Sequence, residues 1–197
     1  MIKGNLKQDI IPVAVLTIVV CVSVILLNVT NGITAENIEA AKNEAVKAML
    51  NEQFPKMDDY SYDEKLEVYT VFSNNEISGY AFMAVANGYG GPIEILVALE
   101  NTSLQEDDII LRGISVVSHS ETPGLGEKIV EASFSGKFTG VNIDEVALSK
   151  DGGKIDAISG ATISSSAVVD AVFGTVQEKA CAICENTDLD FEEGFQI

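Results

Sequence analysis

The amino-acid sequence predicts an α+β protein. One N-terminal transmembrane helix is followed by a single domain with helices packed on a twisted, mainly antiparallel sheet. Three observations support this prediction. The chain of 197 residues opens with a long uncharged run. Its middle holds short segments rich in β-branched and aromatic residues, separated by turn-forming residues. Helical spacing of apolar residues occurs before and after these segments.

The uncharged run extends from Ile10 to Val29, and its 20 residues would span about 30 Å as a helix, enough to cross a bilayer. Lys3 and Lys7 precede it, and the next basic residue is Lys42. The positive-inside rule therefore predicts a cytoplasmic N-terminus and an extracytoplasmic remainder. A cleaved signal peptide is the alternative, but its apolar region is normally about 7–15 residues long. We expect an uncleaved, single-pass anchor in the inner (cytoplasmic) membrane.

A second helix is expected from Thr34, as its N-cap, to about Gln53, because small and apolar residues recur there on one face. It could continue directly from the membrane helix as a stalk.

The β-rich part of the sequence predicts four strands. Residues 68–72 and 77–86 are joined by Ser73-Asn74-Asn75-Glu76, which indicates a hairpin turn. Residues 93–99 and 109–117 form the other two, with an acidic turn between them.

The last helix is expected over residues 164–181, where Val168, Val172 and Val176 form one stripe. An acidic, poorly ordered tail would follow. The predicted organisation is a cytoplasmic N-terminus, a transmembrane helix, an extracytoplasmic domain and the tail, at residues 1–9, 10–29, 30–182 and 183–197.

Composition excludes several classes of function. The formal net charge is −18, and so acidic a chain is a poor nucleic-acid binder. The chain has one arginine, Arg112, and one histidine, His119, which excludes a site built from several histidines or arginines. Cys181 and Cys184 have the spacing of a metal or redox pair, but a structural zinc or an iron–sulfur cluster needs four ligands. We expect no metal, and read this pair as small apolar residues or a local disulfide.

The segment from Asp156 to Ser166 (DAISGATISSS) places several hydroxyls around a turn that begins a helix. The first N–H groups of a helix are unpaired and attract anions, and small residues allow close approach to the backbone. These residues by themselves fit either an anion site or a serine-rich helix cap that needs no ligand.

Asp156–Thr162 (DAISGAT) resembles the sequence that bacterial flavin transferases recognise. The resemblance implies that such a transferase splits FAD and joins FMN, through its phosphate, to the hydroxyl of Thr162.

Two further loops, Gly88–Pro92 (GYGGP) and Ser118–Gly126 (SHSETPGLG), resemble segments of the FMN-binding subunit of the Rnf electron-transport complex. Their order along the chain also resembles that family, from about Ile10 to Ala180. The C subunit of the sodium-pumping quinone reductase shares this domain. Cys181, Cys184 and the acidic tail lie outside the family pattern.

The resemblance implies an electron-transfer subunit of a membrane complex, a translocase that couples ferredoxin:NAD⁺ oxidoreduction to Na⁺ or H⁺ transport, without catalysis by this chain alone. Its partners would be the other Rnf subunits, especially the polytopic ones, the flavin transferase and the lipid bilayer. The alternative is an extracytoplasmic flavin-carrying respiratory component or flavin reductase outside an Rnf complex.

The expected cofactor site has no catalytic residue of its own. The loop of Glu121 to Gly126 would pack on the flavin ring, with Leu125 as an apolar contact. Glu121 could equally brace the loop, and His119 could be a hydrogen-bonded residue at a strand end. The full predicted set is Thr162, Asp156, Ser159, Gly160, Ala161, Ser164, His119, Glu121, Thr122, Gly124, Leu125 and Gly126.

Overall fold

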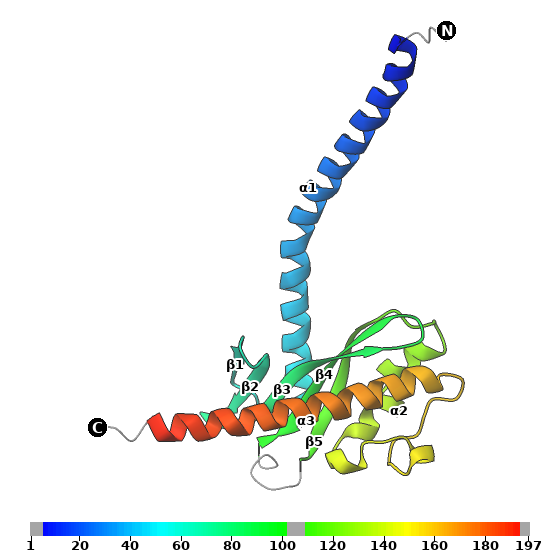
Figure 1. Cartoon of the computed structure of the whole chain (residues 1–197). Coiled ribbons are helices and arrows are strands. Elements are labelled where there is room, and N and C mark those ends of the chain that lie inside the picture. The colour runs from blue at the N-terminus through cyan, green and yellow to red at the C-terminus, as the bar shows by residue number, and fades with distance from the viewer. Residues whose placement is uncertain (1–5, 102–108, 194–197) are drawn as a thin grey trace. The chain divides into compact units, whose positions relative to one another are not determined.

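The computed structural model describes residues 6–101 and 109–193 (Figure 1). The chain divides into two compact units, Met1–Ala45 and Val46–Ile197. The first consists of most of helix α1 (Leu6–Gln53). Within the described residues, no helix combines the length and the apolar character that crossing a membrane requires.

Helix α1 ends at Gln53 as predicted, but it does not begin at Thr34. One continuous helix of 48 residues contains both predicted segments, so the second continues directly from the first, as the sequence allowed. The chain has no proline between Pro12 and Pro55, so nothing there removes a helix hydrogen bond. The expected N-cap at Thr34 was therefore wrong.

The second unit contains a five-stranded antiparallel sheet whose strands follow one another in chain order. The strands are β1 (Asp59–Asp63), β2 (Val68–Ser73), β3 (Glu76–Asn87), β4 (Pro92–Glu100) and β5 (Leu111–His119). The α+β class and the four predicted strands are confirmed. Strand β1 was not predicted. Residues 102–108, most of the acidic turn before β5, lie outside the described residues.

The turn between β2 and β3 has the backbone that its sequence predicts. Asn74 and Asn75 have φ angles of 54° and 64°, in the left-handed region that asparagine tolerates. Two such residues in succession match the right-handed twist of a two-residue hairpin. This local chemistry sets the register next to the turn, where Ser73 pairs with Glu76.

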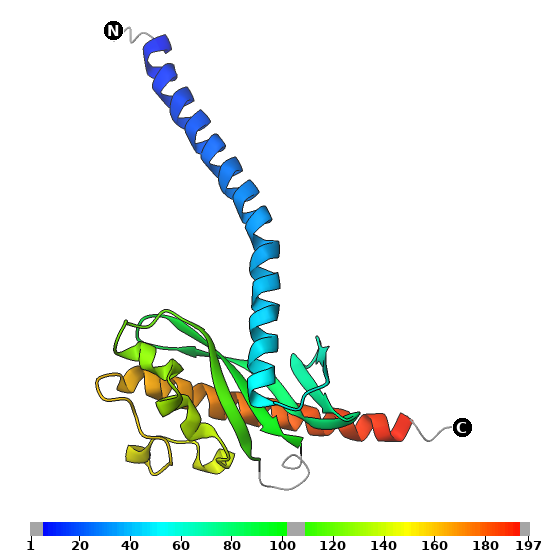
Figure 2. The same ribbon diagram turned by 180° about the vertical axis from the view of Figure 1, so that it is seen from behind.

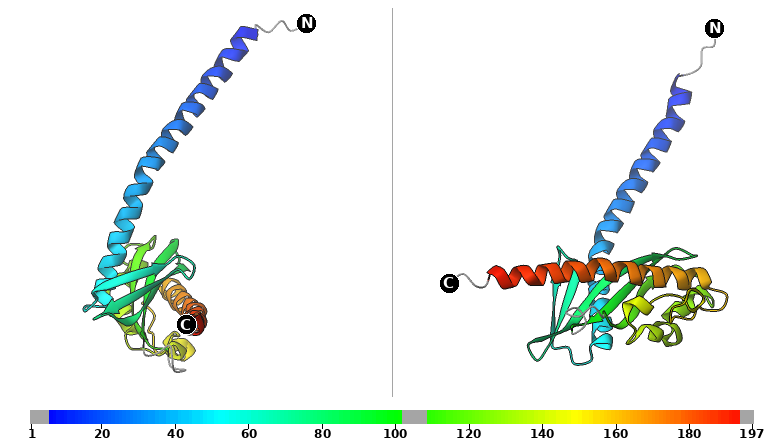
Figure 3. Two further views of the ribbon diagram at one scale, coloured as in Figure 1. Left: turned by 90° about the vertical axis from the view of Figure 1, so that its left-hand side faces the viewer. Right: turned by 60° about the horizontal axis from the view of Figure 1, so that its bottom comes forward.

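One face of the sheet is covered by helix α3 (Thr162–Glu193), as Figure 3 shows in its left-hand view. The residues in this layer are apolar and buried. They are Tyr80, Phe82, Ala84 and Ala86 of β3 and Val168, Val169, Val172 and Val176 of α3. The valine stripe predicted from the sequence therefore contacts the sheet. The helix continues to Glu193, through residues that were assigned to the acidic tail.

The opposite face packs against the last turns of α1. Val46, Leu50 and Phe54 form a second core with apolar residues of β2, β3 and β4. Full burial of a leucine or phenylalanine side chain contributes about 1.5–3 kcal/mol each. Gly79 in β3 lets this contact form, because a Cβ there would overlap the carbonyl oxygen of Leu99 and lie 2.7 Å from Cε1 of Phe54.

Between β5 and α3 the chain forms short helical turns that pack beside β5, at the edge of the sheet, seen from behind in Figure 2. These are η2 (Gly126–Val130), α2 (Ala132–Ser135), η3 (Gly136–Phe138), η4 (Ile143–Glu145) and η5 (Ser149–Asp151). Phe134 and Phe138 pack edge to face, with ring centroids 5.7 Å apart, and anchor these turns to the core. This connection brings the start of α3 back to the end of β5.

Candidate functional site

Three loops that are far apart in the sequence enclose a cavity of about 440 Å³. They are the turn between β3 and β4, the loop after β5 and the start of α3, which lie at the same end of the domain (Figures 1 and 2). A volume of this size is within the usual range for small-ligand sites. The cavity is lined by Tyr89, Glu121, Thr122, Leu125, Gly126, Gly160, Ala161, Thr162, Ile163 and Ser164.

A buried carboxyl group, that of Glu121, connects all three loops. Ser164 Oγ donates to Glu121 Oε2 at 2.8 Å, and the backbone N–H of Gly90 donates to Oε1 at 3.3 Å. A Cβ at Gly88 would overlap Oε1, and a Cβ at Gly126 would overlap Oε2. Glycine is therefore required at both positions for the carboxyl group to fit. The bracing role considered for Glu121 is the one these contacts support.

The hydroxyl groups at the start of α3 differ in their burial and in their hydrogen-bond partners. Ser165 is fully buried, and its Oγ accepts from Ile158 N at 3.0 Å and donates to Ala161 O at 2.9 Å. The hydroxyl of Ser164 donates to the carboxyl group of Glu121. Thr162, the first residue of the helix, is exposed and lines the cavity. The helix start therefore combines an exposed threonine with the first N–H groups of a helix, which favour an anion.

Apolar side chains surround the mouth of the cavity. Tyr89 is 73% exposed, Ile163 59% and Leu125 47%. Leu125 also joins two loops, because its Cδ2 lies 3.3 Å from the position that a Cβ of Gly160 would occupy. Gly160 has a φ of 80°, which favours glycine for its backbone as well. These side chains could contact a flat aromatic group that remains partly exposed to solvent.

Four of the predicted site residues do not line the cavity: Asp156, Ser159, His119 and Gly124. His119 Nδ1 accepts from the backbone N–H of Glu121 at 3.3 Å, at the end of β5. Gly124 has a φ of 75°, and its N–H donates to Glu127 Oε2 at 3.0 Å. These contacts shape the loop that carries Glu121 and Leu125.

Asp156 lies in the loop before α3 and connects this loop to Ser149 and Lys137. The Ser149 hydroxyl donates to Asp156 Oδ1 at 2.6 Å, and Lys137 Nζ lies 3.7 Å from Oδ2. The hydrogen bond from Ser149, followed by the charge of Lys137, lowers the pKa of this exposed carboxyl group. Asp156 is thus an exposed residue that braces this loop and does not line the cavity.

Two lining residues were not among the predicted set. Ile163 directly follows Thr162, and its side chain has no polar group that would indicate a binding role in the sequence. Tyr89 belongs to the Gly88–Pro92 loop, which the sequence singled out without assigning it to the cofactor. Among the described residues, no cluster of three His, Cys, Asp or Glu side chains could hold a metal ion.

Comparison with known proteins identifies the domain. A profile of the FMN-binding domain matches residues 88–177, which include every residue that lines the cavity. The G subunit of the ion-translocating oxidoreductase complex of Methanosarcina acetivorans is 31% identical over 175 residues, covering 83% of this chain and 90% of that protein. The G subunit of the corresponding complex of Vibrio atlanticus is 33% identical over 186 residues, covering 83% and 86%.

A third relative is the G subunit of the proton-translocating ferredoxin:NAD(+) oxidoreductase complex of Clostridium ljungdahlii, 32% identical over 155 residues, covering 76% of this chain and 78% of that one. Among solved structures, Shewanella oneidensis NqrC is 20% identical with a TM-score of 0.49, covering 68% and 74%. The profile defines the class as FMN-binding domain proteins. The chain belongs to the family of G subunits of ion-translocating oxidoreductase complexes.

The cavity fits an FMN. Its apolar rim suits the ring system, and the start of α3 suits a phosphate group. The buried Glu121 carboxyl is satisfied by protein donors, so it needs no ligand to complete its hydrogen bonds.

Proposed function

We propose that this chain carries an FMN joined through its phosphate to Thr162, as the electron-transfer subunit of a membrane complex that couples ferredoxin:NAD⁺ oxidoreduction to Na⁺ or H⁺ translocation. The names of the relatives support the complex. The observation that carries the attachment site is the exposed Thr162, a hydroxyl-bearing residue at the start of α3 that lines the cavity. FMN exchanges one or two electrons, so a bound FMN would connect carriers of both kinds.

The chain's own residues would hold and orient this group. The N–H groups of the first turn of α3 would bind the phosphate, while Leu125 and Tyr89 would contact the ring. Ser164 and Glu121 would keep the three loops at a constant separation. Because a phosphodiester prevents diffusion of the cofactor, electrons must arrive and leave through neighbouring subunits.

The proposal includes a membrane anchor at residues 10–29 and an extracytoplasmic domain at residues 30–182. The described apolar side chains of the anchor segment, such as Leu16, Ile18 and Leu27, are exposed along α1, as a lipid-facing helix requires. The charge asymmetry around the segment supports a cytoplasmic N-terminus. The polytopic subunits, the lipid bilayer and a flavin transferase are the proposed partners.

The attachment is tested by the intact mass of the chain, co-expressed with a flavin transferase. The wild-type chain should carry the added mass of the FMN group, Thr162→Ala should lack it, and Thr162→Ser should retain part of it because the hydroxyl remains. Ser166→Ala is the matched control, since Ser166 lies near Thr162 in the same helix and its Oγ donates to Asp170 Oδ2 at 3.3 Å. Flavin fluorescence of denatured Thr162→Ala protein would refute the assignment.

Topology is tested with the exposed Cys181. A membrane-impermeant thiol reagent applied to intact cells, after reduction, should label the wild-type chain more strongly than a Cys181→Ser variant. Labelling that requires broken cells would contradict an extracytoplasmic domain.

A further inference from the structure

At the start of β5, the edge that faces away from β4 is hydrogen-bonded to a later segment of the chain, residues 140–143. Leu111 N donates to Val141 O at 2.9 Å, and Gly140 N donates to Leu111 O at 2.8 Å. One step earlier, Ile143 N donates to Ile109 O at 2.8 Å. These bonds form a short antiparallel ladder. The ladder ends at Gly140, because the residues before it form η3. The edge of β5 is therefore able to pair, and only part of it is used.

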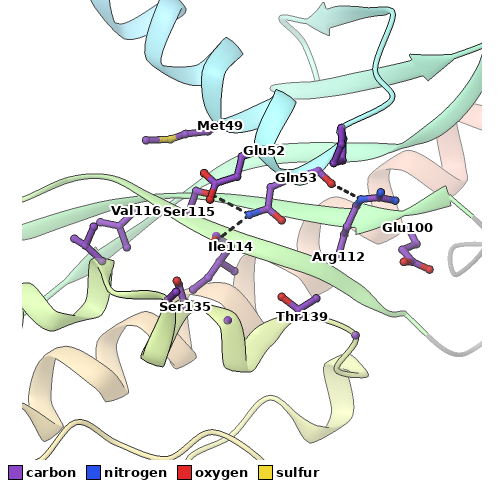
Figure 4. Close-up of a pocket in the computed structure, with 15 residues that line it drawn as sticks. Met49, Glu52, Gln53, Glu100, Arg112, Ile114, Ser115, Val116, Ser135 and Thr139 are labelled. Atoms are coloured by element: carbon purple, nitrogen blue, oxygen red, sulfur yellow. Dashed lines mark hydrogen bonds between the residues drawn. The ribbon is translucent and has the colours of Figure 1, made fainter.

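Beyond this ladder the same edge faces a groove of about 620 Å³ (Figure 4). The last turn of α1 forms one wall with Met49, Glu52 and Gln53, and the opposite wall includes Ser135 and Thr139 of the α2–η3 segment. Strand β5 lies between the walls. The groove is separate from the cofactor cavity, with which it shares no lining residue.

The backbone of β5 has unused hydrogen-bonding groups in this groove. Gln53 Nε2 donates to the carbonyl oxygen of Ile114 at 3.4 Å and to Ser115 Oγ at 3.0 Å, so the backbone of Ile114 faces away from β4. In a strand, the N–H and C=O of one residue point to the same side, and the residue two positions on repeats that direction. Within the described residues, the N–H of Ile114 and both groups of Val116 have no partner outside the sheet. Edge groups of this kind bind an added strand.

The charge of the groove defines the strand that it would accept. The carboxyl groups of Glu52 and Glu100 line it together with one guanidinium group, that of Arg112. This guanidinium is engaged, since its Nε donates to Gln53 O and its Cζ lies 4.7 Å from the centre of the Phe54 ring. The whole chain has a net charge of −18. A second copy of this acidic chain is thus disfavoured, and a basic partner is favoured.

We propose that this groove binds an extended, basic segment of a neighbouring subunit, which adds to the sheet as a sixth strand beside β5. Its backbone pairs with Ile114 and Val116. A lysine or arginine of the segment lies near Glu52, and an apolar side chain packs at the other end on Val130 and Ala132. The inference rests on the proposed function in one respect, namely that the neighbour is another subunit of the same complex.

Hydrogen–deuterium exchange tests the added strand directly. The isolated full chain and the intact purified complex are compared, with exchange resolved at Ile114 and Val116. Both amides should exchange about tenfold or more slowly in the complex, as expected for newly hydrogen-bonded groups. Unchanged exchange in a complex that contains the chain would overturn the added strand and leave the proposed function intact. Absence of the chain from the complex would instead refute the proposed function.

Matched substitutions test the groove. Gly136 has helical φ and ψ angles of −65° and −17°, and a Cβ there would meet no atom within 4 Å, so Gly136→Gln can fill the groove without disturbing the fold. It should reduce recovery of the chain with a tagged polytopic subunit at least about fivefold. Gly174→Gln, at an exposed and equally open position of α3, is the control and should leave recovery unchanged.

The charge is tested by Glu52→Lys, with Glu178→Lys on the exposed side of α3 as its control. Only Glu52→Lys should lower the recovery of the chain with the tagged polytopic subunit. Equal recovery for both members of each pair would overturn the proposal. So would a dimer of the purified chain that protects the same two amides, since it would replace the partner by a second copy.

Discussion

Removal of the Ser164 hydroxyl should destabilise the domain measurably, because it breaks the hydrogen bond that ties α3 to the loop after β5. The bond is 2.8 Å long, and Ser164 and Glu121 are only 1% and 6% exposed. Hydrogen bonds to a charged group contribute about 1.5–3 kcal/mol, and a buried acceptor left without its donor loses a comparable amount. Glu121 keeps the bond from Gly90, which limits the loss. We expect Ser164→Ala to cost about 2 kcal/mol.

The assay is urea unfolding of the purified full chain, followed by circular dichroism. With a slope of about 2 kcal/mol per molar urea, Ser164→Ala should lower the midpoint by about 1 M. Ser166→Ala is the control in the same turn, and should shift the midpoint by less than about a quarter of that, because its bond to Asp170 is long and exposed.

A double-mutant cycle isolates the pair. If Ser164 acts through Glu121, the Ser164→Ala and Glu121→Gln costs should fall short of additivity by about 1 kcal/mol or more. Additive costs, or a midpoint for Ser164→Ala equal to that of Ser166→Ala, would refute the role of this bond in joining the loops.

Three further outcomes are expected. Gly79→Ala should cost about 1–3 kcal/mol in the same assay, because its Cβ would press on Leu99 O and the Phe54 ring, whereas Gly174→Ala should not destabilise. The hydrogen bond from Ser149 lowers the pKa of Asp156 below 3.8, so its charged form stabilises the fold at neutral pH, and this stabilisation is lost as pH falls through the lowered pKa. The urea midpoints of wild type and Asp156→Asn should therefore approach each other as pH is lowered through that range, and a gap that does not narrow would contradict this. Leu125→Asp should slow ferredoxin-driven NAD⁺ reduction by the assembled complex at normal flavin content by mass, and full turnover would mean that the loop is structural only.

Local chemistry in the sequence was sufficient for several elements. The pair Asn74 and Asn75 determines a tight hairpin because both residues tolerate a positive φ. The end of α1 at Gln53 could be predicted because Pro55 follows. The turn rich in small and hydroxyl residues predicted a helix from residue 164, two positions after its observed start at Thr162. Each of these depends on residues within a few positions of one another.

The tertiary structure decided what depends on distant partners. Strand β1 forms because Tyr60 and Tyr62 pack on Tyr69, although the short, polar segment around them carries a weak strand pattern. In the sequence, Ser164, Ser165 and Ser166 are equivalent hydroxyls, and only folding gives them different partners. Glu121 and Ser164 are 43 positions apart, and their contact exists because the sheet and α3 bring both loops to one end of the domain. Sequence patterns report local conformational preference, whereas these contacts depend on loop closure across the whole fold.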